Sequence, residues 1–478
     1  MPSDIIIKIF LHCGDLRMLN FPRGENGYPW ILGHICSAWR EILWSLRSIW
    51  NDIYIFDQTL DSSRPERNTT RNPAIRGALD HILSCTTNLT TATLWGEKAS
   101  LTWDILVAHN HKLSSLNFRD ARKEILVSLL TLPPSSFVNV HTLFISVDSI
   151  RDFPNLDTSI ANDFRSLQTM ILHCNKRSHL VQLPPLPWNQ LTELRIRDCE
   201  FPPQAIYTTF RRCSALVSCE FRISDGGAIP TEEAILLSSL TSLKLTASGS
   251  FDWNSFLHPL IAPALTEMRI TSPRVPLQPL SSFIIRSNCH LQDLFILTYG
   301  VAYIEGDFGQ LLRHLPSLAS IYTTSITPPY VFDELRNGLL SLPSLEVSRW
   351  VVYPEGLWEL LNYIVSATNT QRHIEVMCHE GAGFEDVKRY YLERYDVFQG
   401  VRGLTLKLYE DHKLAPRLIR PKLKKGEIET ELHSEEDFDE YDRMEAEGDF
   451  DDFDEFGVEG EEDEDEENLY PGIAFWPV

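Results

Sequence analysis

LTSLKL, residues 240–245, is a hexad with apolar residues at its first, fourth and sixth positions. The alternation of its last residues is the period of a short β-strand with one buried face. The same hexad recurs along the chain. The clear copies begin at Leu113, Leu191, Leu240, Leu265 and Leu291, weaker ones at Leu89, Val140, Leu167, Leu216 and Leu318, and faint ones at Leu345, Ile374 and Val401.

The spacing of these copies indicates a repeat. From Leu89 to Leu318, successive hexads begin 24 to 27 residues apart. A period of roughly 20–29 residues with this hexad is typical of leucine-rich repeats, each of which contributes one strand and a returning helix or turn. One such unit cannot bury its own apolar faces, so neighbours must stack. We therefore predict an α/β solenoid over residues 89–415, a horseshoe with a parallel sheet on its concave face and helices on its convex face.

The segments between hexads support this interpretation. Several carry apolar residues at helical spacing, which predicts the convex helices. These residues are Ile206, Phe210 and Cys213; Phe308, Leu311, Leu312 and Leu315; and Leu357, Leu360, Leu361 and Ile364. The ninth repeat position, often Asn or Cys in this class, fits cleanly only at Asn175 and Cys199. The horseshoe is therefore expected to be uneven.

The net charge of −23 comes from one segment. Residues 427–467 hold 24 acidic residues and a single basic one, Arg443, which leaves 42 acidic and 42 basic residues elsewhere. The rest of the chain shows no broad basic field for nucleic acid. Self-repulsion predicts that the tail, residues 427–478, is disordered. Its aromatic residues, interleaved with Asp and Glu, leave open whether it binds basic or apolar clefts of partners or only keeps the chain in solution. They are Phe438, Tyr441, Phe450, Phe453 and Phe456.

Residues 416–426 form a basic linker before the tail, and a nuclear-import role for it stays open beside that of a solvated linker. The nine cysteines include no Cys-x-x-Cys pair and are odd in number, which favours reduced thiols. No apolar run approaches the roughly 20 residues that cross a bilayer. We expect a cytoplasmic or nuclear protein, or both, with no membrane partner.

The first 56 residues do not follow the repeat. A helix is expected from Ser3 or Asp4 to about Gly14, and a stronger amphipathic helix from Pro29 to about Leu46. A third element is expected to begin at Ile49. We interpret residues 1–56 as a small helical module and residues 57–88 as a helical connector or cap.

This start resembles the F-box, especially the form common in mushroom-forming fungi. The resemblance rests on Met1-Pro2-x-Asp4-Ile5-x-x-x-Ile9-Phe10, Pro29-Trp30-Ile31-Leu32, Ile35-Cys36-x-x-Trp39-Arg40 and Ile49-Trp50. It implies a substrate-recognition adaptor that docks on a Skp-type linker and, through it, on a cullin–RING ubiquitin ligase, while the repeats bind an unknown protein substrate. The residues that it places in or beside the linker interface are Pro2, Ile5, Ile9, Phe10, Ile35, Trp39 and Trp50.

Two alternatives stay open at this point. Aromatic residues such as Trp39 and Trp50 also fill a module's own core. The first 56 residues can equally be a cap on the exposed end of a ligase-independent repeat scaffold, because terminal repeats need covering.

The sequence lacks four common catalytic or metal-binding patterns. The chain has no nucleophile elbow, no Walker A loop, no dinucleotide fingerprint and no His-Glu-x-x-His. We expect a non-enzymatic protein without a cofactor or a metal. Arg195, Lys244 and Arg269 follow the second apolar residue of three hexads, and Arg197 follows the third apolar residue of the first of them. They predict a mildly basic strip on the strand face that suits an acidic substrate, although scattered charges of this kind are often only solvated.

Overall fold

A computed structural model describes the chain in segments. It covers residues 3–12, 35–45, 52–56, 77, 79–81, 83–84, 89–95, 100–119, 126–127, 129, 136–147, 164–179, 187–224, 233–247, 251–274, 277–298, 306–366, 372–378, 383–395, 398, 404–410 and 417–419. The chain divides into two compact units. Unit 1 comprises Met1–Ser272 with Gln278–Leu291, and unit 2 comprises Pro273–Leu277 with Gln292–Val478.

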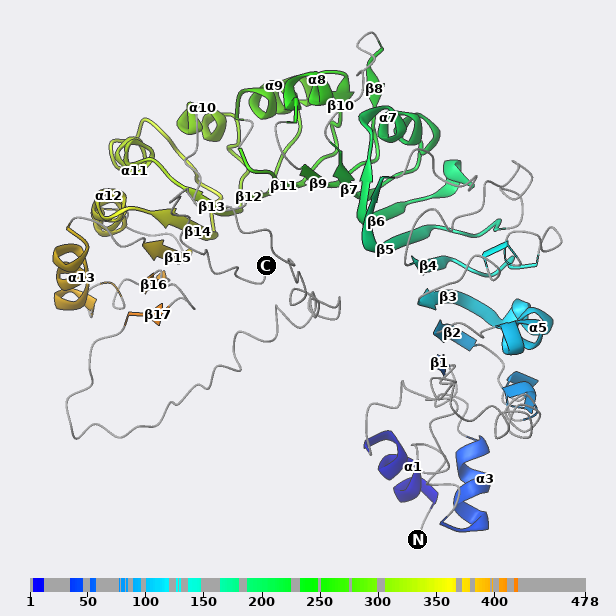
Figure 1. Cartoon of the computed structure of the whole chain (residues 1–478). Coiled ribbons are helices and arrows are strands. Elements are labelled where there is room, and N and C mark those ends of the chain that lie inside the picture. The colour runs from blue at the N-terminus through cyan, green and yellow to red at the C-terminus, as the bar shows by residue number, and fades with distance from the viewer. Residues whose placement is uncertain are drawn as a thin grey trace, which may run out of the picture. The chain divides into compact units, whose positions relative to one another are not determined.

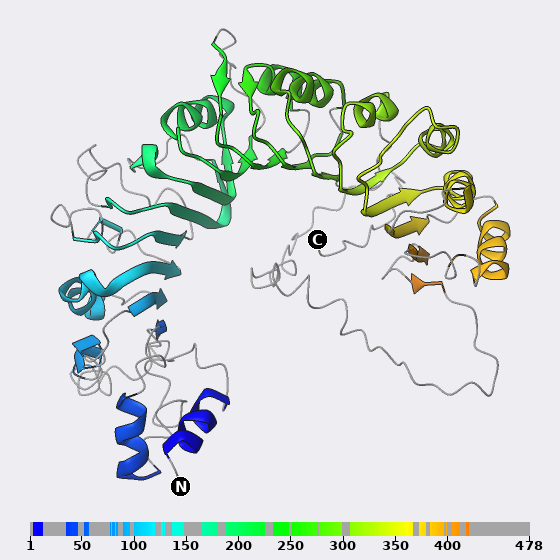
Figure 2. The same ribbon diagram turned by 180° about the vertical axis from the view of Figure 1, so that it is seen from behind.

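Unit 1 is built on parallel strands in sequence order (Figures 1 and 2). Its strands are β1 (Asp52–Phe56), β2 (Leu89–Trp95), β3 (Leu113–Arg119), β4 (Thr142–Val147), β5 (Thr169–His179), β6 (Glu193–Phe201), β7 (Ser218–Ile223), β9 (Ser242–Ala247) and β11 (Glu267–Thr271). Two short parallel strands, β8 (Ile235–Leu236) and β10 (Leu260–Ile261), form a separate pair.

The helices of unit 1 that follow the strands lie on one side of them (Figure 1). They are α5 (Ser100–Ala108), α7 (Pro203–Arg212), α8 (Trp253–Leu257) and α9 (Leu277–Ser287). We call the opposite side of the sheet the open face. Proline at the start of α7 fits the first turn, where its missing N–H costs nothing, and the Asp252 side chain caps α8 by accepting from the Ser255 N–H.

Unit 2 repeats this arrangement. Strands β12 (Asp293–Leu297), β13 (Ser320–Ile326), β14 (Val347–Val352), β15 (Arg372–Cys378) and β16 (Leu404–Glu410) are parallel, and β17 (Arg417–Leu418) pairs antiparallel with β16. Its helices are α10 (Phe308–Arg313), α11 (Pro329–Arg336), α12 (Pro354–Ser366) and α13 (Phe384–Glu393). They too lie on one side of their strands, which gives unit 2 its own open face (Figure 2).

The hexads predict the strands closely. Each of the thirteen hexads begins within three residues of the first residue of a parallel strand. Helices α7, α10 and α12 lie where the apolar spacing predicts them, and their apolar residues are buried. The α/β class with parallel strands is therefore confirmed, and it is compatible with a solenoid.

The core lies between the strands and the helices. The apolar hexad residues are almost fully buried, as at Leu243 and Leu245, while the residues between them are half-buried on the open face. This period of two divides most strand residues between core and open face, while the last residues of β4, β12, β13 and β14 are buried in succession. The candidate binding residues of the strands are therefore those between the leucines.

Part of the N-terminal prediction is wrong. Residues 52–56, assigned to the helical module, form strand β1, which pairs with β2 from Asp52–Thr91 to Phe56–Trp95. The run Ile53-Tyr54-Ile55-Phe56 consists of β-branched and aromatic residues, which favour a strand. Among the described residues of the module, the helical part is α1 (Ser3–His12) and α3 (Ser37–Ser45), which contact each other. The described residues of the 57–88 connector are helical. The basic linker beyond Ile419 and the acidic tail lie outside the described residues.

Candidate functional site

Two exposed isoleucines mark the N-terminal helices. On α1, Ile6 is buried, whereas its neighbour Ile5 is 48% exposed. Ile35, two residues before α3, is 57% exposed. Ile9 and Trp39 are half-buried. Exposed apolar surface is unfavourable in water. A partner that covers these side chains would gain roughly 25 cal/mol for each Å² of apolar surface that it buries.

Four of these residues are among the seven that the family resemblance assigns to the linker interface: Ile5, Ile9, Ile35 and Trp39. Pro2 and Trp50 lie outside the described residues, as does the side chain of Phe10. The alternative that Trp39 fills the module's core stays open, because it is half-buried and has contacts within the protein.

The open face of unit 1 carries the predicted basic residues in rows. The register aligns Ile171, Arg195, Glu220, Lys244 and Arg269 on successive strands β5, β6, β7, β9 and β11. All five side chains are half-buried. Three of the four predicted residues therefore lie in one row, and Arg197 lies two residues further along β6.

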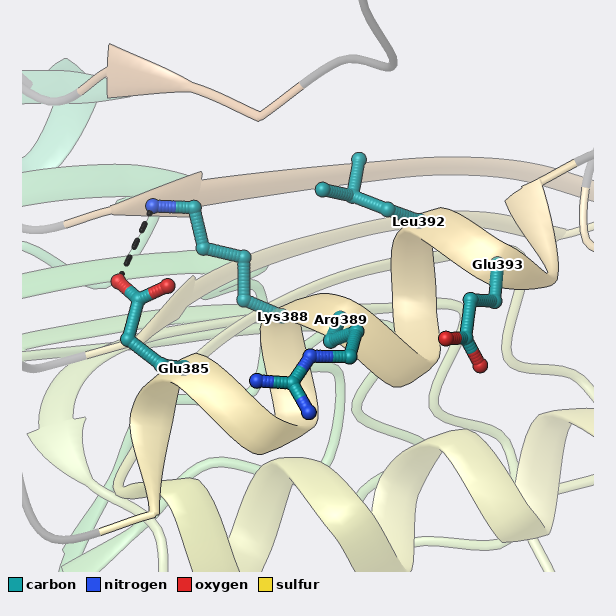
Figure 3. Close-up of a pocket in the computed structure, with 5 residues that line it drawn as sticks. All are labelled: Glu385, Lys388, Arg389, Leu392 and Glu393. Carbon is teal, nitrogen blue, oxygen red and sulfur yellow. Dashed lines mark hydrogen bonds and ion pairs between the residues drawn. The ribbon is translucent and has the colours of Figure 1, made fainter.

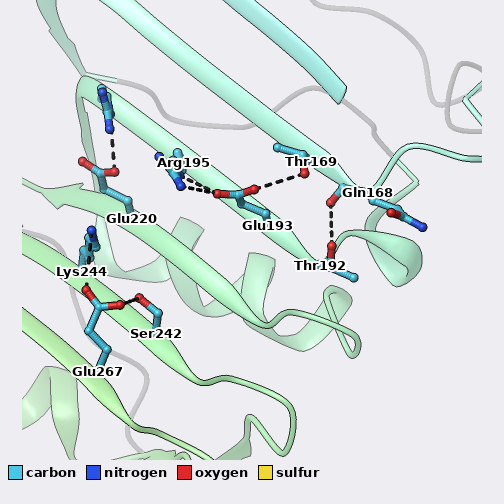
Figure 4. Close-up of polar contacts among 10 residues, drawn as sticks. Gln168, Thr169, Thr192, Glu193, Arg195, Glu220, Ser242, Lys244 and Glu267 are labelled. Carbon is cyan, nitrogen blue, oxygen red and sulfur yellow. Dashed lines mark hydrogen bonds and ion pairs between the residues drawn. The ribbon is translucent and has the colours of Figure 1, made fainter. Parts of the chain in front are cut away.

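Each of three predicted cations has an acidic partner (Figure 4). Arg195 forms an ion pair of 2.6 Å with Glu193, Arg197 one of 3.4 Å with Glu220, and Lys244 one of 3.6 Å with Glu267. Hydroxyl groups contribute in the neighbouring row, two residues earlier on each strand, where Thr169 donates to Glu193 and Ser242 to Glu267. Partly exposed pairs of this kind contribute only about 0.2–1 kcal/mol each to stability.

The strip is therefore charge-balanced and not basic. Strands β6, β7, β9 and β11 carry five basic and five acidic residues in total. The least exposed pair is Arg222–Glu200 at 3.2 Å. The sequence prediction counted cations beside the second leucine and overlooked the acids one repeat away. Substrate binding on this face stays a prediction, but the expected preference for an acidic substrate loses its basis.

A polar chain that sequence reasoning missed crosses β4, β5 and β6. The Ser146 hydroxyl oxygen lies 3.5 Å from Nδ1 of His173, and Nε2 of His173 lies 2.9 Å from Asp198. The hydrogen bond with His173 lowers the pKa of the Asp198 carboxyl against the opposing effect of burial. Although this is the residue order of a catalytic triad, Ser146 is only 4% exposed, and a substrate cannot reach its hydroxyl. These hydrogen-bonded side chains therefore connect three neighbouring strands.

Beside it, the expectation of reduced thiols fails at one pair. Cys174 on β5 and Cys199 on β6 form a disulfide with Cα atoms 5.8 Å apart. Their separation of 25 residues is one repeat, which places them on adjacent strands. The five other described cysteines are free, and four of them are buried; these five are Cys36, Cys213, Cys219, Cys289 and Cys378.

The open face of unit 2 has a different composition. Its central row is Phe295, Tyr322, Arg349, Glu375 and Lys407, one residue from each strand β12 to β16. The carboxylate of Glu375 lies close to three basic side chains. Its oxygens are 3.5 Å from Arg349, 3.1 Å from His373 and 3.5 Å from Lys407. Burial raises the pKa of the Glu375 carboxyl, but the hydrogen bond with His373 and the charges of Arg349 and Lys407 outweigh burial and lower it.

This cluster predicts a pH-dependent stability. A carboxyl whose pKa is lowered in the folded state stabilises the fold above its unfolded pKa, near 4.5, and this contribution disappears as the pH falls through the folded value. At neutral pH, Glu375→Gln is expected to cost about 1–3 kcal/mol because it removes the negative charge that pairs with Arg349 and Lys407. The difference from the unsubstituted protein should shrink in urea titrations as the pH falls below about 4.5 and the carboxyl becomes protonated. A difference that is constant from pH 7 to pH 3 would contradict this role.

Elsewhere the surface offers little chemistry. A depression of about 410 Å³ on α13 is lined by Glu385, Lys388, Arg389, Leu392 and Glu393, all from one helix (Figure 3). Four of the five side chains are charged, which is typical of a solvated helix face. In the part of the chain that the structure describes, no three His, Cys, Asp or Glu residues are grouped as a metal site requires. None of the described helices is long and apolar enough to cross a membrane.

Comparison with known proteins adds no family. No protein-family model matches the chain, and no curated protein sequence matches it.

Proposed function

We propose that this chain is the substrate-recognition subunit of a ubiquitin ligase of the Skp-cullin-F-box type. Helices α1 and α3 dock on the Skp-type linker, and the strand faces of the leucine-rich repeats bind a protein substrate. The chain positions the chemistry of its partners and catalyses no step itself. Its place of action is the cytoplasm, the nucleus or both.

The observation that carries the proposal is the exposure of Ile5 and Ile35. Both belong to the F-box-like pattern, and both leave an apolar side chain in water beside the contacting helices α1 and α3. Burying one isoleucine is worth about 1.5–3 kcal/mol. Two such residues supply a substantial part of a protein–protein interface if one partner covers both, because a few buried anchors carry most of its binding energy.

The open face of unit 1 supports the substrate half. Arg195, Glu220 and Lys244 alternate in sign across three neighbouring strands, and Phe144 and Ile171 continue the same row with apolar side chains. A surface with this mixture selects by charge pattern and shape and not by net charge. A folded or extended protein segment with matching charges is the ligand that it fits best.

Single substitutions to glutamate at Ile5 and at Ile35 test the docking half. Each is expected to weaken binding to the Skp-type linker of the same organism by at least about tenfold, since a buried charge replaces a buried isoleucine. The measurement is titration calorimetry with the full chain, with circular dichroism as the check on folding.

Ile285→Glu is the matched control. Ile285 lies on α9 and is 54% exposed, close to the 57% of Ile35, but it is outside the F-box-like pattern. Its binding should be unchanged. Equal losses at Ile35 and Ile285, or binding retained by both N-terminal variants, would refute docking through α1 and α3.

The second candidate is a ligase-independent scaffold whose N-terminal residues cap the repeats. The pairing of β1 with β2 favours it, because residues 52–56 are part of the sheet and shield the backbone edge of β2. Both functions are compatible with this pairing. Truncations that either keep or remove β1 can distinguish them.

Two truncations make that separation. Removing residues 1–56 takes away β1 and is expected to cause aggregation, because it exposes the edge of β2. Removing residues 1–45 keeps β1. If α1 and α3 are a docking module, the shorter truncation stays folded with a nearly unchanged melting temperature and loses only the linker. If they are a cap, both truncations aggregate, as light scattering would show.

A further inference from the structure

The open face of unit 2 combines an aromatic pair with a cationic cluster. The rings of Phe295 and Tyr322 are 6.1 Å apart, and the guanidinium of Arg349 lies 4.9 Å from the Tyr322 ring and donates to its hydroxyl at 2.9 Å. The rings lie on β12 and β13, and the cations lie on β14 to β16. The row therefore changes from aromatic to cationic along the strand order β12 to β16.

The cationic end has an excess of positive charge. Arg349 and Lys407 carry permanent charges, and His373 adds a third when protonated, while Glu375 is their shared carboxylate. Of the other acidic residues in strands β12 to β16, Asp293 lies on β12 at the far end of the strand order, and Glu410 is the last residue of β16, three residues after Lys407. The Lys407 and His373 side chains are 40% and 36% exposed, so an anionic ligand can reach them.

The chain itself supplies a segment of complementary chemistry. Residues 450–456 read FDDFDEF, three aromatic rings among four carboxylates, within a tail whose residues 427–467 carry a net charge of −23. Aromatic side chains can stack on Phe295 and Tyr322, and the carboxylates can pair with Arg349 and Lys407.

The tail begins at the correct edge of unit 2. Strand β17 pairs with β16, the strand of Lys407, and the described chain ends at Ile419. Four gaps of roughly 4.8 Å separate β12 from β16, about 19 Å in all. Seven extended residues span about 23 Å, and the 30 residues from 420 to 449 reach up to about 100 Å at full extension. Residues 450–456 can therefore cover the row.

We propose that the open face of unit 2 binds the acidic–aromatic tail of this chain, with residues 450–456 lying across β12 to β16. Tethering gives the tail an effective concentration in the millimolar range, so a weak contact suffices. Any other ligand of this face must displace the tail, which makes the tail a competitor built into the chain. This inference does not depend on the proposed ligase function.

Zero-length crosslinking of the full chain with a carbodiimide tests the contact. Lys407 should form amide bonds with tail carboxylates, which trypsin releases as peptides 426–443 and 444–478. Lys388 on α13 is the matched control, because it also pairs with a glutamate at 3.5 Å but lies on a helix (Figure 3). After normalisation to coupling with added acetate, Lys407 is expected to exceed Lys388 at least tenfold. The excess should fall in 0.5 M NaCl, which screens exposed charges.

A chain with Phe450, Phe453 and Phe456 replaced by serine keeps every charge and should crosslink several-fold less at Lys407. Equal normalised yields at Lys407 and Lys388 would overturn the proposal, because the tail would then be sampling cations at random. A mixture of 14N- and 15N-labelled chains reports the origin of the tail. In a 1:1 mixture, crosslinks formed between chains would join a labelled to an unlabelled chain in about half of the cases, and a mixed fraction near that value would also overturn it.

Discussion

Replacing Trp350 by alanine is expected to lower the free energy of unfolding of unit 2 by about 3–5 kcal/mol. Trp350 lies on β14, is 2% exposed, and faces the helices of this unit. Its ring contacts Phe332 on α11 edge-on at 5.4 Å and Phe308 on α10 at 6.5 Å. One side chain thus joins a strand to two helices, and its removal leaves a cavity that the surrounding rings cannot fill.

Urea unfolding followed by circular dichroism measures this loss. Trp358→Ala is the matched control, because Trp358 on α12 is 40% exposed and contacts Tyr390 at the surface, with ring centroids 4.5 Å apart. It should cost no more than about 1.5 kcal/mol. Similar losses at the two positions would mean that Trp350 does not hold strand and helices together as its burial indicates.

Trp350 also illustrates how much of the fold the sequence predicts. It is the sixth residue of the faint hexad that begins at Leu345. Strand β14 begins two residues after the start of that hexad, at Val347. The hexads predict strands well because alternation and repeat length act together: burial sets which residues point to the helices, and the repeat sets where the next strand begins. Even weak copies are therefore placed to within a few residues.

The errors have a common cause. Strand β1 was missed because residues 52–56 carry no Leu hexad, although their β-branched and aromatic residues favour a strand. The acidic partners Glu220 and Glu267 lie 23 residues after Arg197 and Lys244, and Cys199 lies 25 residues after Cys174. One repeat length is the distance between neighbours on adjacent strands. Pairing each polar residue with the residue one repeat length later in the sequence predicts these contacts.

The candidate docking surface could be predicted only by its residue types. Ile5 and Ile6 are adjacent and chemically identical, yet one is exposed and the other buried. Which of two such residues faces a partner depends on how α1 packs on α3, and that packing is a tertiary contact without a local sequence signal. The family resemblance therefore named a set of residues, and the structure orders the described members of that set by exposure.

The disulfide gives the second large effect. Joining Cys174 to Cys199 closes a loop of one repeat and restricts the unfolded chain, which is worth about 3 kcal/mol for a loop of this length. Cys199→Ser should therefore destabilise unit 1 by about this amount under oxidising conditions. In a reducing compartment the unsubstituted protein should have the same lower stability, because the bond is then absent.

Thermal unfolding with and without dithiothreitol distinguishes the stability contributed by the disulfide bond from that contributed by the packing of the two sulfur atoms. The reductant should lower the melting temperature of the unsubstituted chain and leave that of Cys199→Ser unchanged, because the variant has no bond to reduce. Cys289→Ser, which alters a buried free thiol of unit 1, should keep the full response to dithiothreitol. Nine reactive thiols in the denatured, unreduced chain, or an equal response in all three proteins, would refute the disulfide. Confirmation would tie the stability of unit 1 to the redox state of its surroundings.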